Sequence, residues 1–92
     1  MPCRRREVAA DLRYLTAHDC HLCERGRGIV DALASDLDLS VEEIPWADEE
    51  ATALVTRDGV PFPPALYRGD RLLGFGRLSE RRLHKLLEAV TA

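Results

Sequence analysis

The sequence places two cysteines three positions apart, in the segment Cys20-His21-Leu22-Cys23. One helical turn spans this spacing, so the two sulfur atoms can come within bonding range. A bond between them would close so short a loop that it removes little chain entropy, and a purely stabilising role is weak. Two kinds of chemistry therefore remain for the pair. One is metal binding, and the other is thiol–disulfide exchange through a thiolate nucleophile.

Metal binding is the alternative use of this segment, because His18 and His21 flank Cys20. Zinc takes four ligands in a tetrahedron. Residues so close in sequence cannot easily supply four ligands at the start of a helix, and no second C-x-x-C or H-x-x-x-H completes a site. Sharing of ligands across a dimer stays open, and we expect no resident metal.

Two neighbours can change how readily the Cys20 thiolate forms. A charged His21 would stabilise the thiolate and make the disulfide more oxidising, whereas Asp19 would act in the opposite direction. The residues leave open which effect dominates, and a solvated His21 with little influence is equally compatible. Cys3 has no partner in sequence and is expected to be a free thiol on a loose tail.

A helix between two strands is predicted to position the dithiol. Asp11–Ala17 has the pattern of a strand, and Leu39–Ile44, closed by Pro45, has that of a second strand. Between them, the apolar face of a helix is formed by Leu22, Gly26, Ile29, Val30, Leu33 and Leu37. Asp19 is the candidate N-cap of this helix, which we expect to end near Ser35. The three elements predict a parallel βαβ unit.

The second half of the sequence predicts a short helix, a hairpin and a last helix. The short helix begins at Asp48-Glu49-Glu50, has the apolar stripe Ala51, Leu54 and Val55, and stops at Gly59. The strands Ala65–Arg68 and Arg71–Leu73 flank Gly69-Asp70, which suits a type II′ turn between antiparallel strands. The last helix has Ser79 as its cap, Leu78 and Leu83 as a hydrophobic staple, and Leu83, Leu86, Leu87 and Val90 as its apolar face.

A C-x-x-C motif next to a βαβ pattern is typical of a thioredoxin-like redox motif. The order of the elements, the cysteine pair after the first strand and the proline before the third strand together resemble the glutaredoxin branch of the thioredoxin superfamily. The resemblance covers about Asp11–Val90. It implies an α/β fold with a four-stranded mixed sheet, order 2-1-3-4, and helices on both faces. We expect one domain over residues 1–92, with 1–7 a loose basic tail.

The resemblance also implies residue roles. Cys20 would be the exposed nucleophile, and Cys23 would be the resolving thiol that breaks the mixed disulfide. Pro64 matches the family's cis-proline best, with Pro61 the weaker candidate, and the adjacent backbone would hold the substrate chain. The segment Leu73-Gly74-Phe75-Gly76 resembles the glycine-containing turn of glutaredoxins. The substrate-binding candidates are therefore Phe62, Pro63, Pro64, Gly74, Phe75 and Gly76.

Three segments depart from the glutaredoxin pattern. His21-Leu22 replaces the frequent Pro-Tyr, Phe62-Pro63-Pro64 replaces Thr-Val-Pro, and Gly74-Phe75-Gly76-Arg77 replaces the Gly-Gly pair and the Asp that follows it. These changes leave the dithiol intact and leave glutathione specificity open, so the reductant is glutathione or another small thiol. Phe62, Phe75 and Leu22 are expected to form an apolar collar around the dithiol that docks an extended protein segment.

Composition limits the partners. The chain has 92 residues, 46% hydrophobic and 32% charged, which suits one globular domain. A net charge of −3 argues against nucleic acid, and the basic cluster Arg4-Arg5-Arg6 is expected to be a solvated tail. No apolar run reaches the roughly 20 residues of a membrane helix, and no export signal is visible, so we expect a cytoplasmic protein.

The expected partner is a disulfide-containing protein or a small-thiol mixed disulfide. The protein itself is expected to be a monomer. The alternative function is a non-catalytic binding or metal-carrying module that uses the same cysteines. Trp46 is expected to cover the core, with a position in a partner groove as the alternative.

Overall fold

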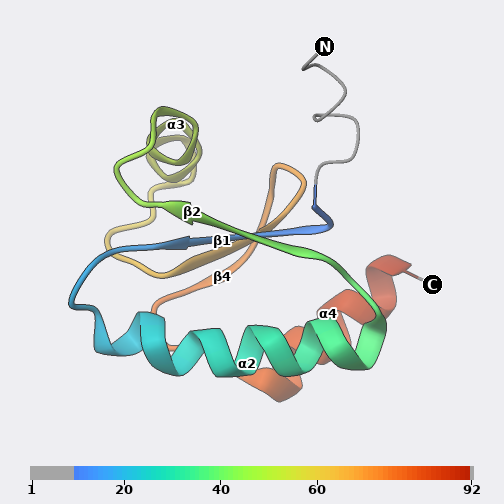
Figure 1. Cartoon of the computed structure of the whole chain (residues 1–92). Helices are drawn as coiled ribbons and strands as arrows, with labels where there is room; N and C mark the ends of the chain where they lie inside the picture. Colours follow the sequence, from blue (N-terminus) through green and yellow to red (C-terminus); the bar gives the residue numbers. More distant parts are fainter. Residues whose placement is uncertain (1–9, 92) are drawn as a thin grey trace, which may run out of the picture.

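The computed structural model describes residues 10–91, with side chains up to Glu88. Seven elements follow one another in the predicted order (Figure 1), and they are β1 (Leu12–Thr16), α2 (His21–Leu37), β2 (Val41–Pro45), α3 (Glu49–Asp58), β3 (Ala65–Arg68), β4 (Arg71–Phe75) and α4 (Glu80–Thr91). The predictions for Cys3, for the basic tail and for the side chain of Val90 fall outside the described residues.

The four strands form one mixed sheet in the order β2-β1-β3-β4. β1 pairs with β2 in parallel and with β3 antiparallel, and β3 pairs antiparallel with β4. Helices α2 and α4 lie on one face of the sheet, and α3 lies on the other (Figure 1). The predicted fold class, including the strand order 2-1-3-4, is confirmed.

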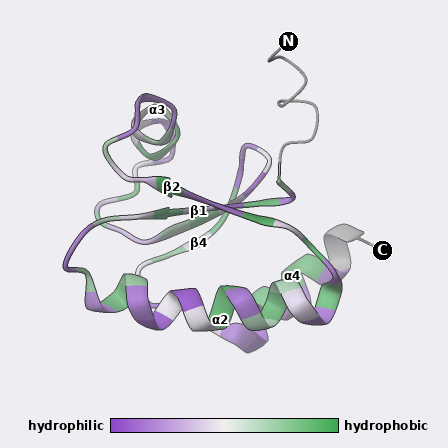
Figure 2. Cartoon of the chain, in the orientation of Figure 1, coloured by the Kyte–Doolittle hydropathy of each residue, from purple (hydrophilic) through white to green (hydrophobic). Residues whose placement is uncertain are grey.

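Each face of the sheet has its own hydrophobic cluster, because side chains of a strand alternate between the two faces. Leu12 and Tyr14 of β1 point toward α2 and α4, whereas Leu15 points toward α3. The buried cluster under α2 and α4 contains Leu12, Tyr14, Val30, Leu33, Leu66, Leu78, Leu83 and Leu87. The buried cluster under α3 contains Leu15, Ile44, Ala51, Val55, Val60, Ala65 and Tyr67. Along α2, hydrophobic and hydrophilic residues alternate as an amphipathic helix requires (Figure 2).

Two predictions about the ends of α2 were wrong. The N-cap is Cys20 and not Asp19, because Asp19 adopts a left-handed conformation with φ 49°, whereas an N-cap needs the extended conformation that Cys20 has. The helix also continues past Ser35 to Leu37. It ends where Asp38 turns left-handed with φ 56° and donates its N–H to the carbonyl oxygen of Ala34.

The remaining turns follow the predicted chemistry. Asp48 caps α3 by accepting from the N–H of Glu50, and Gly59 ends that helix with φ 67°. Gly69 begins the β3–β4 turn with φ 64°. Ser79 Oγ accepts from the N–H of Arg82 in the first turn of α4.

Two further details differ from the predictions. β4 continues two residues past Leu73 to Phe75, with a register shift opposite Leu66 and Tyr67. On α4, Leu83 and Leu87 are buried as predicted, but Leu86 is 38% exposed. A residue adjacent in sequence to Leu87 is turned by about 100° around the helix, so the two side chains cannot both point into the core. Within residues 10–91, no helix combines the length and the apolar character needed to cross a membrane.

Candidate active site

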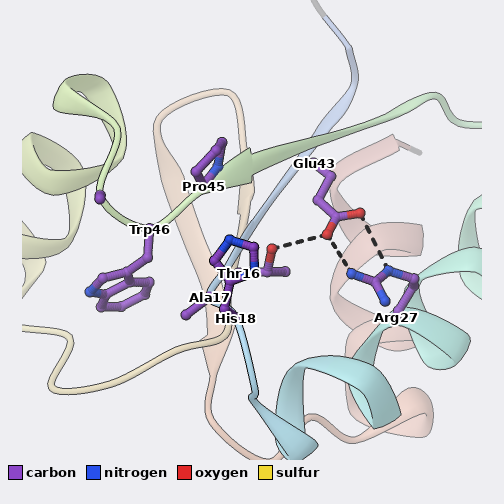
Figure 3. Close-up of a pocket in the computed structure, with 8 residues that line it drawn as sticks. Thr16, Ala17, His18, Arg27, Glu43, Pro45 and Trp46 are labelled. Atoms are coloured by element: carbon purple, nitrogen blue, oxygen red, sulfur yellow. Dashed lines mark hydrogen bonds and ion pairs between the residues drawn. The ribbon is translucent and has the colours of Figure 1, made fainter.

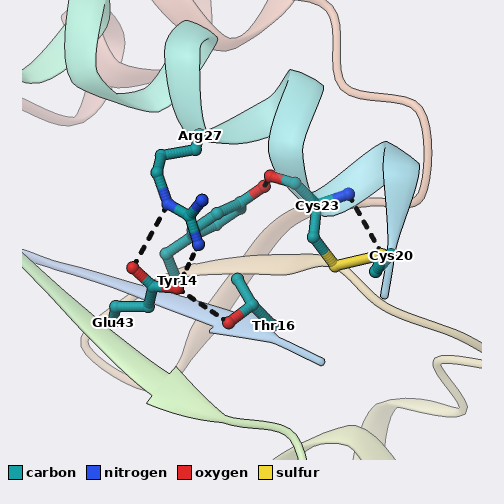
Figure 4. The surroundings of a disulfide bond; sticks show 6 residues. All are labelled: Tyr14, Thr16, Cys20, Cys23, Arg27 and Glu43. Atoms are coloured by element: carbon teal, nitrogen blue, oxygen red, sulfur yellow. Dashed lines mark hydrogen bonds and ion pairs between the residues drawn. A yellow bond between two sulfur atoms is a disulfide. The ribbon is translucent and has the colours of Figure 1, made fainter. Parts of the chain in front are cut away.

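Cys20 and Cys23 are joined by a disulfide, with their Cα atoms 5.1 Å apart (Figure 4). Cys20 is half-buried, whereas Cys23 is only 2% exposed. The backbone N–H of Cys23 donates a hydrogen bond to Sγ of Cys20 at 3.0 Å. The pair therefore has one accessible and one buried sulfur, and a backbone donor points at the accessible one.

A tight turn between β1 and α2 brings the cysteines to this position. β1 ends at Thr16, and His18 and Asp19 form the turn that leads into Cys20. The short polar side chain of Asp19 tolerates the left-handed conformation that this turn requires. His21 is exposed as the first residue of α2, so both predicted modulators of the thiolate lie beside Cys20.

We call residues 18–23, which carry both cysteines, the dithiol turn. Tyr14 contacts the buried side of this turn. Its hydroxyl donates a hydrogen bond of 2.7 Å to the carbonyl oxygen of Cys23 (Figure 4). Tyr14 is 1% exposed, and burial raises the pKa of its hydroxyl to about 12. The hydroxyl therefore remains protonated and remains a donor at neutral pH.

An ion pair between Arg27 and Glu43 connects α2 to the sheet. The Arg27 guanidinium forms a bidentate ion pair with the carboxylate of Glu43 on β2, which also accepts from the Thr16 hydroxyl at 3.0 Å (Figure 4). The hydrogen bond from Arg27 is the main reason that the pKa of Glu43 is lowered, and the same bond raises the pKa of Arg27. Both side chains therefore stay charged at neutral pH.

A groove opens beside the dithiol turn, at the carboxyl ends of the parallel strands β1 and β2. Its cavity volume is about 710 Å³, and it is lined by Thr16, Ala17, His18, Arg27, Glu43, Pro45, Trp46 and Ala47. Figure 3 shows Trp46 at one end and the Arg27–Glu43 pair at the other. Trp46 also packs against the cluster under α3, so the core position predicted for it is confirmed, and the same side chain lines the groove.

Most of the predicted substrate-binding residues gather on the other side of the dithiol turn. The strand register aligns Leu15 of β1 with Ala65 of β3, and Ala65 with Phe75 of β4. Pro64, just before Ala65, therefore lies at the same end of the sheet as the turn after β1. The cis peptide bond predicted at Pro64 is present between Pro63 and Pro64.

An aromatic pair is exposed at this end of the sheet. The rings of Phe62 and Phe75 meet edge to face with centroids 5.8 Å apart, and the side chains are 48% and 40% exposed. Gly76 lies beneath Phe62, since a Cβ at this position would stand 2.8 Å from the ring. Its N–H donates to the carbonyl oxygen of Pro64 at 2.7 Å. Gly74, on β4 opposite Leu66, does not join this group, because a Cβ at this position would face Leu78 and Leu83 in the cluster under α2 and α4. Leu22, the third predicted member of the collar, is half-buried on α2.

Four residues of the candidate site were not predicted from the sequence, namely Tyr14, Gly26, Arg27 and Glu43. Tyr14 lies within the predicted first strand and Gly26 on the predicted apolar face of the helix, and neither pattern assigns the residue a role at the dithiol. A glycine on the buried stripe of a helix does signal a close approach. The predicted parallel strands also indicated where a groove could lie, because ligands often bind outside the carboxyl ends of such strands.

A metal site receives no support from side-chain placement. Among residues 10–91, His, Cys, Asp and Glu nowhere form a group of three or more that could hold a metal ion. The two histidines that flank Cys20 therefore do not converge with the cysteines into a ligand set.

Comparison with known proteins finds no match by sequence but a similar fold among solved structures. No family model matches the sequence, and no curated protein matches it either. Among solved structures, thioredoxin 1 from the thermophilic eubacterium Thermosipho africanus TCF52B is similar, with a TM-score of 0.57 and 16% sequence identity. The match covers 88% of this chain and 98% of that thioredoxin. The strand order and this structural likeness together show that the chain has a thioredoxin-like fold.

Proposed function

We propose that the protein is a thiol–disulfide oxidoreductase of glutaredoxin-like type, with Cys20 as the nucleophile and Cys23 as the resolving thiol. The observation that carries the proposal is the unequal burial of two bonded cysteines at the start of α2. A substrate can reach Cys20, where the helix N-terminus and the Cys23 N–H favour a thiolate. Cys23 is shielded from solvent and next to Cys20, as an intramolecular resolving group requires.

The reaction proceeds in two exchange steps. The Cys20 thiolate attacks one sulfur of a substrate disulfide, which forms a mixed disulfide and releases the other sulfur as a thiolate. Cys23 loses its proton and attacks Sγ of Cys20, which releases the second substrate thiolate and forms the Cys20–Cys23 disulfide. Two electrons pass to the substrate, and its two thiolates take up the two protons. An external thiol then reduces the disulfide again.

Two apolar surfaces support an extended protein segment as the substrate. In the sheet order, β1 and the dithiol turn lie between β2 and β3. The Trp46 groove follows β2, and the Phe62–Phe75 pair lies at the ends of β3 and β4. A substrate chain that places its disulfide at Cys20 would therefore have an apolar surface on each side. The backbone next to Pro64 is the proposed partner for its main chain.

The reductant in this proposal is glutathione or another low-molecular-weight thiol, and the expected compartment is the cytoplasm, where thiols stay reduced. The charged pair in the Trp46 groove is internally neutralised, because Arg27 and Glu43 bind each other. This pair therefore gives the groove no net charge that would favour glutathione over a neutral thiol. We propose a monomer that binds neither nucleic acid nor membrane.

Redox equilibration tests the proposal. The protein would carry Cys3→Ser, so that Cys20 and Cys23 are its only thiols. After equilibration in a series of thiol/disulfide buffers and acid quenching, intact mass should show a reversible loss of two hydrogens. The midpoint should fall between about −270 and −120 mV. Alkylation of Cys20 should have a midpoint below about pH 8.5, the value for an ordinary cysteine.

Single-cysteine variants separate the two roles. Cys23→Ser should accumulate a mixed disulfide with a substrate protein, because the first step proceeds and the second cannot. Cys20→Ser should trap none, since Cys23 is buried. Absence of a reversible disulfide in the parent, or a stoichiometric metal that survives the buffers, would reject the oxidoreductase.

A further inference from the structure

Tyr14 reaches the dithiol from the core and not from the surface. It lies on β1 and packs in the cluster under α2 and α4, with its hydroxyl at 2.7 Å from the carbonyl oxygen of Cys23. The hydroxyl is a polar group in an otherwise apolar cluster, and the bond to Cys23 satisfies it. The proposed exchange reaction makes no use of this tyrosine.

Gly26 makes this contact possible. It lies three residues after Cys23 on α2, and a Cβ at residue 26 would collide with the Tyr14 hydroxyl. Gly28, the other glycine of α2, has nothing within 4 Å of the corresponding position. A glycine in a helix interior costs about 1 kcal/mol relative to alanine. At position 26 the glycine has a specific structural role, because the absence of a Cβ leaves room for the Tyr14 hydroxyl beneath the dithiol turn.

The hydrogen bond from Tyr14 continues into the backbone of Cys20. The carbonyl of Cys23 shares its peptide group with the N–H of Glu24, and that N–H donates to the carbonyl oxygen of Cys20 at 3.1 Å. Tyr14 O–H, the Cys23–Glu24 peptide and the Cys20 carbonyl therefore form a chain of two hydrogen bonds. Hydrogen bonds in such chains polarise one another. The hydroxyl thus connects β1 to the backbone of Cys23 directly, and to that of Cys20 only through the first helical hydrogen bond of α2.

We propose that Tyr14 is a positioning residue of the dithiol, which fixes the first turn of α2 and favours the reduced, thiolate form of the cysteine pair. The inference rests on the proposed oxidoreductase function and adds a residue to it. The hydroxyl polarises the Cys23–Glu24 peptide and holds the first turn of α2, whose N-terminal N–H groups stabilise the anionic thiolate and have no charge to stabilise in the disulfide. Loss of the hydroxyl should therefore shift the equilibrium toward the disulfide.

Tyr14→Phe tests the proposal because it removes the hydroxyl and keeps the ring. Equilibration in thiol/disulfide buffers should show the disulfide favoured by about threefold over the parent, a fraction of one hydrogen bond. For a two-electron couple this change corresponds to about 14 mV. The alkylation midpoint of Cys20 should move to higher pH in the same variant.

Tyr67→Phe is the matched control. Tyr67 is also buried, and its hydroxyl donates to Asp58 at 2.8 Å. Burial, followed by the Asp58 hydrogen bond, raises its pKa to about 12 as well. It packs in the cluster under α3, on the opposite face of the sheet from Tyr14. Its loss should cost comparable stability and leave the redox equilibrium unchanged.

The glycines of α2 give a second comparison. Gly26→Ala should displace the Tyr14 hydroxyl and reproduce the shift toward the disulfide, whereas Gly28→Ala should leave the equilibrium at the parent value. An unchanged equilibrium in Tyr14→Phe, or an equal shift in Tyr67→Phe, would overturn the positioning role. A parent without any reversible disulfide would instead reject the underlying oxidoreductase function.

Discussion

Cys20 and Cys23 share one bond but lie in different surroundings, and the residues around them determine what can approach. Cys20 caps α2 and faces solvent in part, whereas Cys23 faces the core. Beyond Cys20, the exposed aromatic pair of Phe62 and Phe75 is unusual in a chain with only 5% aromatic residues. Exposed aromatic side chains near a reactive group are suited to binding a partner chain.

Phe62→Ala should weaken the reaction with a protein disulfide. The ring is half exposed, and covering the exposed part with a substrate would contribute about 1–2 kcal/mol, or roughly 5- to 30-fold in kcat/KM. Reaction with a small disulfide such as 2-hydroxyethyl disulfide should be unaffected, because it reaches Cys20 without touching the ring. Leu86→Ala, which removes an exposed apolar side chain from α4, is the control. Equal losses with both substrates would count against a docking role.

The elements were largely predictable from the sequence, because their signals are local. The alternating strands, the apolar stripe of α2 and the caps at Asp48, Gly59 and Ser79 each depend on residues a few positions apart. The contacts that shape the candidate site are not local. Tyr14 meets Gly26 only because β1 and α2 pack together, and Arg27 meets Glu43 across 16 positions. No pattern within one element reveals such a pair.

The Arg27–Glu43 pair joins α2 to β2, and Glu43→Gln should test its contribution. The pKa of Glu43 is lowered in the folded protein, mainly by the Arg27 hydrogen bond, so its stabilisation is present above the unfolded pKa near 4.5. It is lost as pH falls through the lowered folded pKa. Because both side chains are nearly half exposed, we expect the variant to lose only about 0.2–1 kcal/mol at pH 7.

Urea unfolding at several pH values measures this difference. The gap between parent and Glu43→Gln should close as pH drops well below 4.5, where the parent carboxyl is protonated. Glu42→Gln, at the exposed neighbouring position of β2, is the matched control and should differ little from the parent at any pH. A gap of the same size at pH 7 and at pH 2.5 would show that packing, not charge, is responsible.

At the scale of the whole molecule, one sheet joins two hydrophobic clusters, and both contribute residues to the site. The cluster under α2 and α4 contains Tyr14, whereas Trp46 packs against the cluster under α3 and lines the groove. The dithiol turn follows β1, which, like β3, contributes to both clusters, here through Tyr14 and Leu15. Because both faces contribute to the site, we expect the site to be ordered only while the two faces are folded together.

Leu87→Ala tests whether the two faces unfold as one unit. Leu87 is fully buried on α4, and its truncation should cost about 2–5 kcal/mol out of a total of about 5–15 kcal/mol. Trp46 is the single tryptophan and reports on the opposite face. If the sheet couples both clusters, tryptophan fluorescence and far-UV circular dichroism should shift to the same lower urea midpoint. Leu86→Ala should stay within about 0.5 kcal/mol of the parent, because Leu86 is exposed. A fluorescence midpoint that remains at the parent value while the circular dichroism midpoint falls would mean that the α3 face, and the groove with it, persists without α4.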